Sequence, residues 1–581
     1  MGRALVLFLV ALLLLAWGEE PRCGSGDPCV FLDKDTGWVL WRKPDWTERP
    51  YPPRSDSWKR PESTIYLSIA SFRDKLCPLT LYNVFTKAKH PQRIFPGVVQ
   101  QNVLDEGVDL DCLDTYCMLV EDFGFGNATS TTALLDAVTS PQSAYKSGRR
   151  PLSTAQCPYY ANVRMDRVNA RTAMGPTWAR ARGSAMLRNE EFCMQTDAHM
   201  DFVEDWDVKM MGMWGATNNE YAVLSTYVAP TEQLKFNVGG GAKGLNALHE
   251  VPHLCMVTLF GSHDLPRIWG TKCARSLPEP KLTNGIWGAG LSFSKCHAER
   301  KSPYDPHTPQ IFDGEEFSRS VRFWTWGYDI YTPHRVNVVH NYHVSQSDPT
   351  HFDWARNAVG TGETSAVRIK TLIGAPGGET SEQAAAAVVQ SRYGLGDRRT
   401  LDQFIAFSGI DTKKRKILGN RCGNIDYVPF REHPLGPEYV PAFDAKTEAP
   451  LDPRDPGSVY FDGSAESTKA WEAFADERRR SLAQQVRANS AATAAFGATI
   501  SLRRSSSSSS SSAAAAAAAQ GGASLLKLSA QSHMSKSDKA LLGFTVFGIV
   551  ALALYAACCR KHFTEVFLGL GKGRGGTSKR T

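Results

Sequence analysis

Asp197 and His199 stand two residues apart, directly after the short apolar run Phe192–Thr196. If that run is a buried strand, the two side chains project from the same side of an extended backbone. A carboxylate and an imidazole are both ligands of divalent metal ions. The spacing therefore predicts that Asp197 and His199 bind one divalent ion at the end of a strand, where open α/β sheets hold ligands. The alternative is a strand that simply ends in two polar residues.

A third ligand can come from a second apolar run, Arg335–His343, which ends in two histidines. His340 and His343 are both candidates, because each lies near the end of the expected strand. We favour His340 as the third metal ligand, and the alternative is a histidine with a structural role. The sequence has no Cys-x-x-Cys pair, so a structural zinc site is not expected.

Two arginine-containing segments could hold the phosphates of a nucleotide. A predicted strand ends in small residues that are followed by Arg73 and Asp74, which could contact a uridine or a phosphate. Arg171 and Arg180 flank the start of a helix expected over residues 175–188, and both helix starts and arginines suit a diphosphate. The alternatives are a salt-bridged surface turn and arginines on an ordinary helix surface.

A glycine-rich segment and a pair of carboxylates could contact the rest of such a ligand. Asn284–Phe293 is expected to be a strand, and Gly288 and Gly290 within it suggest close approach of a ligand. Glu315 and Glu316 begin an expected helix, and carboxylates suit the hydroxyls of a sugar or a developing oxocarbenium ion. The same pair would also suit the positive end of a helix dipole.

Both ends of the chain carry apolar stretches. Ala4–Trp17 is too short to span a bilayer comfortably and is typical of a signal peptide, with an uncleaved anchor as the alternative. Ala540–Cys559 is uncharged and long enough for a transmembrane helix, with a buried helix as the alternative. More basic residues follow this stretch than precede it, which predicts a cytosolic tail and a luminal body.

Composition limits the class of protein. The chain has 581 residues, of which 42% are hydrophobic, so it can bury one large or two ordinary domains. A net charge of +7 is too small for this length to argue for a nucleic-acid partner. Of the thirteen cysteines, Cys558 and Cys559 adjoin the apolar stretch. The other eleven are expected to form disulfides in an oxidising compartment, with at least one left over, but their pairing cannot be read from the sequence.

The middle of the chain alternates short apolar runs with helical patterns, which predicts an α/β domain. An insertion into this domain is expected at about 232–282, with Gly239–Gly241 as a mobile loop. The expected strands are 64–70, 93–100, 192–196, 221–228 and 256–260, and the expected helices are 78–89, 175–188, 205–213, 314–326, 384–393 and 401–407.

Taken together, these motifs closely resemble the GlcNAc transferases that modify hydroxyproline on a ubiquitin-ligase adaptor, and their relatives that start mucin-type chains in protozoa. The resemblance spans roughly Ser63 to Asp411, which is far more specific than one short motif. The matching blocks are Ser68–Asp74, Ala173–Arg180, Gln195–Asp207, Trp287–Phe293, Tyr304–Asp305, Gly314–Glu316, Trp324–Tyr331, His340–Tyr342 and, in a C-terminal cap, Tyr393–Gly396, Arg398–Leu401 and Phe407–Asp411.

The resemblance implies a GT-A fold with a Rossmann-like central sheet, UDP-GlcNAc as donor, Mn²⁺ or Mg²⁺ as cofactor, and retention at the anomeric carbon. With the motifs above, we expect the metal to be held by Asp197, His199 and His340, and the donor to contact Arg73, Asp74, Arg171, Arg180, Asp197, Gly288 and Gly290. Glu315 and Glu316 would orient the GlcNAc hydroxyls or stabilise the cation.

The adaptor-modifying enzymes are cytosolic, whereas this chain carries a signal sequence and a membrane segment. We therefore expect a secretory protein acceptor with hydroxyproline, Ser or Thr, and a Golgi or endoplasmic reticulum membrane with the catalytic domain in the lumen. The rivals are transfer of another UDP-sugar and a non-catalytic, lectin-like luminal membrane protein.

The expected organisation has seven parts. They are a signal peptide at 1–18, an irregular segment at 19–62, a GT-A catalytic domain at 63–345, a helical cap at 346–430, a disordered low-complexity stalk at 431–539, a transmembrane helix at 540–559 and a cytosolic tail at 560–581.

Overall fold

The computed structural model describes residues 23, 26–103, 108–126, 131–140, 143, 145, 150–231, 250–342 and 361–430. Among these residues, no helix is both long and apolar enough to cross a membrane. The predicted signal peptide, stalk, transmembrane helix and cytosolic tail lie outside the described residues, as do His343 and Gly239–Gly241.

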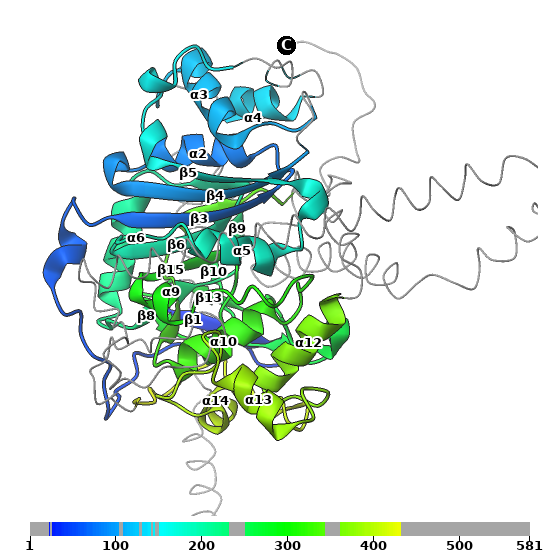
Figure 1. The fold of residues 1–581 in the computed structure, drawn as a ribbon. Coiled ribbons are helices and arrows are strands. Elements are labelled where there is room, and N and C mark those ends of the chain that lie inside the picture. The colour runs from blue at the N-terminus through cyan, green and yellow to red at the C-terminus, as the bar shows by residue number, and fades with distance from the viewer. Residues whose placement is uncertain are drawn as a thin grey trace, which may run out of the picture.

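The described part of the chain is built around an eight-stranded sheet (Figure 1). Its strands follow one another across the sheet in the order β14 (Lys281–Leu282), β16 (Asp329–Thr332), β8 (Ala222–Ser225), β15 (Leu291–Lys295), β6 (Phe192–Asp197), β3 (Ile65–Phe72), β4 (Ile94–Asn102) and β5 (Arg164–Asn169). β6, β3, β4 and β5 are parallel to their neighbours in this series, whereas β15 runs antiparallel to β6 and β8. The carboxyl ends of the four parallel strands therefore share one edge of the sheet.

Helices cover both faces of the sheet, which explains why its central strands are apolar on both sides. Ile65, Leu67 and Ile69 of β3 belong to a core shared with helices α2 (Cys77–Thr86), α3 (Cys112–Phe123) and α6 (Trp206–Ala216). Tyr66, on the opposite face of β3, packs in a second core with Trp178 of helix α5 (Pro176–Ser184). The arrangement is a three-layer α/β/α sandwich, with α2, α3 and the short α4 (Thr131–Thr139) at the top in Figure 1.

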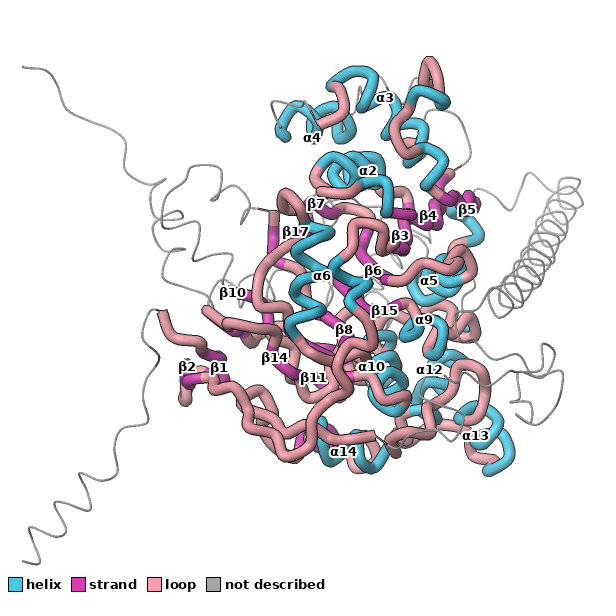
Figure 2. Tube along the Cα trace, turned by 90° about the vertical axis from the view of Figure 1, so that its left-hand side faces the viewer, coloured by secondary structure: helices cyan, strands magenta, loops and turns pink. Residues whose placement is uncertain are grey.

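Two smaller sheets complete the body. β17 (Val338–His340) lies between β7 (Met200–Phe202) and β9 (Ala229–Pro230), and Figure 2 shows β7 and β17 side by side. Another sheet has the order β10 (Glu250–Pro252), β13 (Cys273–Arg275), β1 (Cys29–Asp33) and β2 (Gly37–Leu40). A short hairpin pairs β11 (Val257–Thr258) with β12 (Arg267–Ile268).

A helical cap follows the body that contains these sheets. It contains α12 (Thr361–Leu372), α13 (Glu382–Val389), α14 (Leu401–Ser408) and the hairpin of β18 (Ile410–Asp411) with β19 (Lys416–Ile417). Phe317 and Val321 of α10 (Glu315–Thr325) share an apolar core with Ile369 of α12 and Phe404 of α14. The remaining helix, α9 (His297–Lys301), follows β15 directly.

Disulfides join distant parts of the described chain. Ten cysteines form five pairs, which are Cys23–Cys29, Cys77–Cys112, Cys117–Cys157, Cys193–Cys296 and Cys255–Cys422. Four of the five connect different elements or segments more than thirty residues apart in sequence.

Two expectations need correction, and one helix was not expected. The segment expected to be irregular, 19–62, contains the β1–β2 hairpin, because pairing of β1 with β13 gives it a sheet to join. The glycine-rich strand expected over Asn284–Phe293 begins only at Leu291, since the residues before it form turns. Helix α3, which no expectation included, begins at an Asp111 side chain that accepts the backbone N–H groups of Leu113 and Asp114.

Candidate functional site

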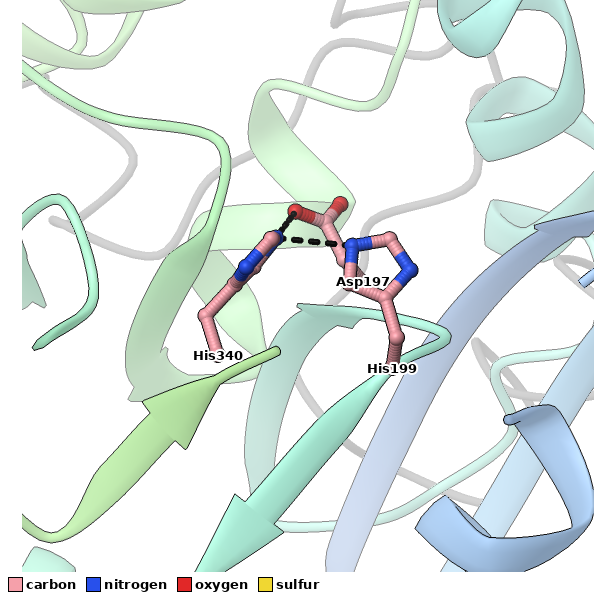
Figure 3. Close-up of side chains that lie close together, drawn as sticks. All are labelled: Asp197, His199 and His340. Carbon is pink, nitrogen blue, oxygen red and sulfur yellow. Dashed lines mark hydrogen bonds and ion pairs between the residues drawn. The ribbon is translucent and has the colours of Figure 1, made fainter. Parts of the chain in front are cut away.

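Three side chains meet at the carboxyl edge of the sheet (Figure 3). Asp197 is the last residue of β6, His199 lies in the turn between β6 and β7, and His340 is the last residue of β17. One ligand atom from each side chain lies within 4.8 Å of the other two. The two imidazole Nε2 atoms are 2.7 Å apart, and His340 Nε2 is 3.5 Å from Asp197 Oδ2. The structure thus brings together the three residues expected to bind metal.

The backbone between β6 and β7 is held in place by a threonine and by β17. The hydroxyl of Thr80 on α2 donates to the carbonyl of Ala198 at 2.8 Å and accepts the N–H of Met200 at 2.9 Å. The N–H of Asn341 donates to the carbonyl of His199 at 2.9 Å. These contacts fix the turn that carries His199 against the strand that carries His340.

The chemistry of the three donors fits a divalent transition ion. Two nitrogens and one carboxylate oxygen suit Mn²⁺ or Zn²⁺, whereas Ca²⁺ prefers six or more oxygen ligands. Burial, together with the neighbouring charge of His199, lowers the pKa of His340 to about 4, so its ring is neutral at pH 7. Metal binding needs deprotonated ligands, and a neutral imidazole meets that need.

The neighbours of Asp197 and His199 shift the pKa values of both side chains toward their charged forms. Burial opposes ionisation of Asp197, but contact with His340 and the charge of Arg180 outweigh it and hold the pKa of Asp197 well below its usual range. Burial also opposes a charge on His199, yet Asp74 outweighs burial and raises the pKa of His199. Asp197 is therefore a carboxylate under all ordinary conditions.

Arg180 links Asp197 to one of the two carboxylates at the start of α10. Its Nη2 donates to Asp197 Oδ1 at 2.8 Å, and its Nη1 donates to Glu315 Oε1. The hydroxyl of Tyr304 donates to the same oxygen of Glu315 at 3.0 Å. Arg180 thus lies beside the metal ligands, but it bridges two carboxylates in this structure and Glu315 is engaged on both sides.

Glu316 lies toward the glycine-rich turn. Its Oε1 accepts the N–H of Ala289 at 2.8 Å, and its Oε2 accepts the hydroxyl of Tyr227 at 2.7 Å. Burial raises the pKa of Glu316 to about 7, although these two donors and a nearby arginine act against it. A Cβ at Gly290 would lie 3.9 Å from Asp197 Oδ2, so this turn passes beside the metal ligands. A Cβ at Gly288 would overlap Leu254, at 2.6 Å.

The other residues that were expected to contact the nucleotide are found next to other groups of the protein. Arg73 forms an ion pair with Asp109, with Nε 3.0 Å from Oδ2, and Asp74 contacts His199. Arg171 is exposed after β5, at the same edge of the sheet. Three strand spacings separate β5 from β6, so the axes of these two strands lie about 14 Å apart. Arg73 thus pairs with Asp109, and Arg171 follows β5, not the strands that carry Asp197 and His340.

Three tyrosines and Thr80 support the site without any signal in their local sequence. Tyr227 holds Glu316 and Tyr304 holds Glu315, as described above. The ring of Tyr342 lies 3.9 Å from that of His340, and its hydroxyl donates to the carbonyl of Val228 at 2.8 Å. Tyr304 and Tyr342 fall in blocks that carry the family resemblance, and this is the only sequence signal that could have pointed to them.

A family model described as glycosyltransferase (GlcNAc) matches residues 64–414, which is more than half of the chain. The chain belongs to this glycosyltransferase family. All of the residues expected at the site lie within the matched range, so the metal cluster is part of the family domain. No curated protein matches this sequence.

Solved structures of glycosyltransferases show distant likenesses to the family domain. GalNAc-T7 with UDP, GalNAc and Mn²⁺ is 15% identical over 59% of this chain and 54% of its own, with a TM-score of 0.33. The mannosyltransferase PcManGT of Pyrobaculum calidifontis with GDP-Man and Mn²⁺ is 12% identical over 60% of this chain and 82% of its own, with a TM-score of 0.26. TarS 1–349 of S. aureus with UDP-GlcNAc is 10% identical over 57% of this chain and 72% of its own, with a TM-score of 0.28. This chain thus spans about half the length of the first, and TM-scores this low support no conclusion about activity.

Proposed function

We propose that this protein is a metal-dependent, retaining glycosyltransferase of the GT-A fold, which moves GlcNAc from UDP-GlcNAc to a hydroxyl of a protein acceptor. The observation that carries the proposal is the meeting of Asp197, His199 and His340 at one point inside a GlcNAc-transferase family domain. The family description favours GlcNAc over other sugars as the transferred group. The ligand set disfavours a calcium-dependent lectin, because two of its three donors are nitrogens.

The ligand residues would hold a divalent ion such as Mn²⁺, which when bound supplies positive charge to a departing diphosphate. Arg180 keeps Asp197 ionised and adds a fixed positive charge beside it. Preorganised charge of this kind is usually the largest contribution to catalysis. The residues of the site thus favour departure of UDP without requiring a protein nucleophile.

The two carboxylates at the start of α10 take different parts in this proposal. Glu315 is held by Arg180 and Tyr304, so we assign it to shaping the site. Glu316 is held against the turn of Gly288–Gly290, which passes beside Asp197. Glu316 is therefore the better candidate to contact the hydroxyls of the donor sugar.

The acceptor and the compartment are part of the same proposal. Disulfides persist in oxidising compartments, and five of them in the described residues support a secretory protein. We propose a Golgi or endoplasmic reticulum protein with a luminal catalytic domain, anchored by 540–559. An acceptor exposed in that lumen would present hydroxyproline, Ser or Thr.

The test is a transfer assay with the full-length protein in detergent. UDP-GlcNAc, UDP-GalNAc, UDP-glucose and UDP-galactose are each offered with Mn²⁺ and with peptides that contain hydroxyproline, Ser or Thr. We expect transfer from UDP-GlcNAc, loss of transfer on chelation, and recovery when Mn²⁺ is restored. Preference for another sugar would overturn the assigned donor, and the absence of any metal-dependent transfer or hydrolysis would overturn the proposed activity.

Asp197→Asn is the matching variant. It keeps the shape of the side chain but removes the carboxylate that binds metal and pairs with Arg180, so we expect a loss of transfer of at least about 100-fold. Asp402→Asn removes one carboxylate from the exposed surface of α14 and should leave transfer unchanged. Full activity of Asp197→Asn would contradict the site.

A further inference from the structure

The chain turns sharply where β3 ends, and this turn points Asp74 at a metal ligand. Arg73 has a φ of 52°, in the left-handed region that non-glycine residues rarely adopt. Its N–H donates to the carbonyl of Gln101 at 3.0 Å, and its guanidinium pairs with Asp109. Asp109 also accepts the N–H of Val103 at 2.8 Å. Arg73 is thus anchored to the end of β4, and it holds the turn in place.

The carboxylate of Asp74 is fixed at both oxygens. Oδ1 accepts the N–H of Leu76 at 2.8 Å, just before α2 begins. Oδ2 lies 2.5 Å from Nδ1 of His199, and both side chains are about one-tenth exposed. β3 and β6 are adjacent and parallel, with Ala70 opposite Asp197, so the residues that follow the two strands meet at the same edge.

This contact decides which ring nitrogen of His199 carries hydrogen. An ionised carboxylate only accepts hydrogen bonds, so Nδ1 must be the donor to Asp74. In the neutral ring, the lone pair is then on Nε2. Nε2 is the atom that lies 2.7 Å from Nε2 of His340, within the metal cluster.

We propose that Asp74 is a positioning residue for metal binding, which orients His199 and keeps its Nε2 free to bind the ion. The inference rests on the proposed metal-dependent function and replaces the expected role of Asp74 as a contact to uridine or phosphate. Carboxylates that hold a ligating histidine typically contribute 10- to 100-fold to metal affinity. Asp74 therefore acts through His199, and its effect appears first in metal binding and only then in transfer.

The test measures Mn²⁺ affinity of the full-length protein by electron paramagnetic resonance in the absence of donor. Asp74→Asn is expected to weaken Mn²⁺ binding by about 10- to 100-fold. Saturating Mn²⁺ should restore most of the transfer rate, because the ligands themselves remain. A merely structural role would lower the rate in a way that extra metal cannot repair.

Asp201→Asn is the matched control. Asp201 lies two residues after His199, and its carboxylate pairs with Lys87 at 2.5 Å. The same substitution there can lower stability, but it should leave Mn²⁺ affinity within about twofold of the wild type. If Asp74→Asn fails to fold, Asp74→Glu retains the carboxylate and should bind Mn²⁺ with an affinity between those of the wild type and Asp74→Ala.

The outcomes separate the two proposals. Wild-type affinity in Asp74→Asn, with loss of binding in Asp197→Asn, would overturn the role of Asp74 and leave the proposed function standing. A loss that saturating Mn²⁺ does not repair would also overturn it. No Mn²⁺ binding by the wild type would overturn both.

Discussion

Glu315 and Glu316 are neighbours in sequence, yet their side chains lie in different electrostatic environments. Glu315 is 4% exposed and shares a hydrogen-bonded ion pair with Arg180, so its charge is compensated. Glu316 has neutral donors, the N–H of Ala289 and the hydroxyl of Tyr227. Neutral donors compensate a buried charge less well than a guanidinium does. Residue identity alone therefore does not separate the roles of the two carboxylates.

This difference predicts how stability depends on pH. Burial raises the pKa of Glu316 from an ordinary 4.5 to about 7, so the folded state favours the protonated acid. The resulting stabilisation is fully present below about pH 4.5 and is lost as pH rises through 7. Glu316→Gln cannot ionise, so its stability relative to the wild type should rise between pH 4.5 and 8.5 by about 1–3 kcal/mol.

Chemical denaturation at several pH values measures this effect. Glu382→Gln, at the exposed start of α13, controls for the loss of one carboxylate. A difference between Glu316→Gln and the wild type that stays constant from pH 4.5 to 8.5 would contradict the assignment. Transfer by Glu316→Gln should fall as well, since the proposed contact to sugar hydroxyls loses its charge.

At the scale of elements, the turn before helix α10 determines where Glu315 and Glu316 lie. Gly314 precedes the helix with a φ of 90°, and a Cβ there would lie 2.7 Å from Leu265. Just before it, Asp313 accepts the N–H of Ser262 and the guanidinium of Arg267, each at 2.6 Å. The turn thus fixes the start of α10 against the segment between β11 and β12. The helix cannot begin one residue earlier or later without moving Glu315 and Glu316.

Gly314→Ala tests this dependence. The substitution introduces both a left-handed strain and an overlap with Leu265, so we expect a loss of about 1–3 kcal/mol in unfolding free energy. Transfer should fall further than stability alone explains, because the carboxylates shift with the helix start. Gly212→Ala in α6 meets nothing within 4 Å and should be neutral or slightly stabilising in thermal unfolding. Unchanged stability and activity of Gly314→Ala would contradict the argument.

At the scale of the whole described molecule, the cap is tied to the catalytic body by an apolar core and by a disulfide. α12 and α14 pack against α10, the helix that carries the two carboxylates. Cys255 and Cys422 join the segment before β11 to the chain after β19 across 167 residues. Cys422 and Cys255 lie in a buried cluster with Trp41 of the N-terminal segment. Three distant parts of the chain therefore stabilise one another.

Removal of this disulfide should cost more stability than removal of a short-loop one. A cross-link stabilises mainly by restricting the unfolded chain, and the effect grows with the loop that it closes. The double change Cys255→Ala with Cys422→Ala should lower unfolding free energy by about 2–5 kcal/mol. The change Cys23→Ala with Cys29→Ala opens a loop of six residues and should cost less.

Calorimetry of both double variants provides the comparison. Mn²⁺ affinity of the folded Cys255/Cys422 variant should stay close to that of the wild type, because the metal ligands lie on β6, β17 and the turn after β6. Equal or smaller losses for Cys255/Cys422 would contradict the proposed role of the long cross-link.

Local patterns in the sequence were sufficient for the strands and helices that bury one or two apolar faces. Ile65–Phe72 and Phe192–Asp197 are strands whose residues are mostly apolar and buried on both faces, as expected for parallel strands covered on both sides. The two-residue spacing of Asp197 and His199 was also sufficient to predict that both lie at the end of one strand. The β1–β2 hairpin and the turn of Asn284–Gly290 escaped prediction, because pairing with β13 and packing with Leu254 are not local.

Only the tertiary structure decided which of these polar side chains contact one another. His340 lies 141 residues after His199 and reaches it because β17 pairs with β7. Asp74, expected to contact a nucleotide, lies against His199, because β3 and β6 are neighbours in the sheet. Residue types and short spacings determine which chemistry is possible, since they depend on nearby atoms alone. The partner of each polar group depends on strand order and helix packing, which arise from contacts between segments far apart in the chain.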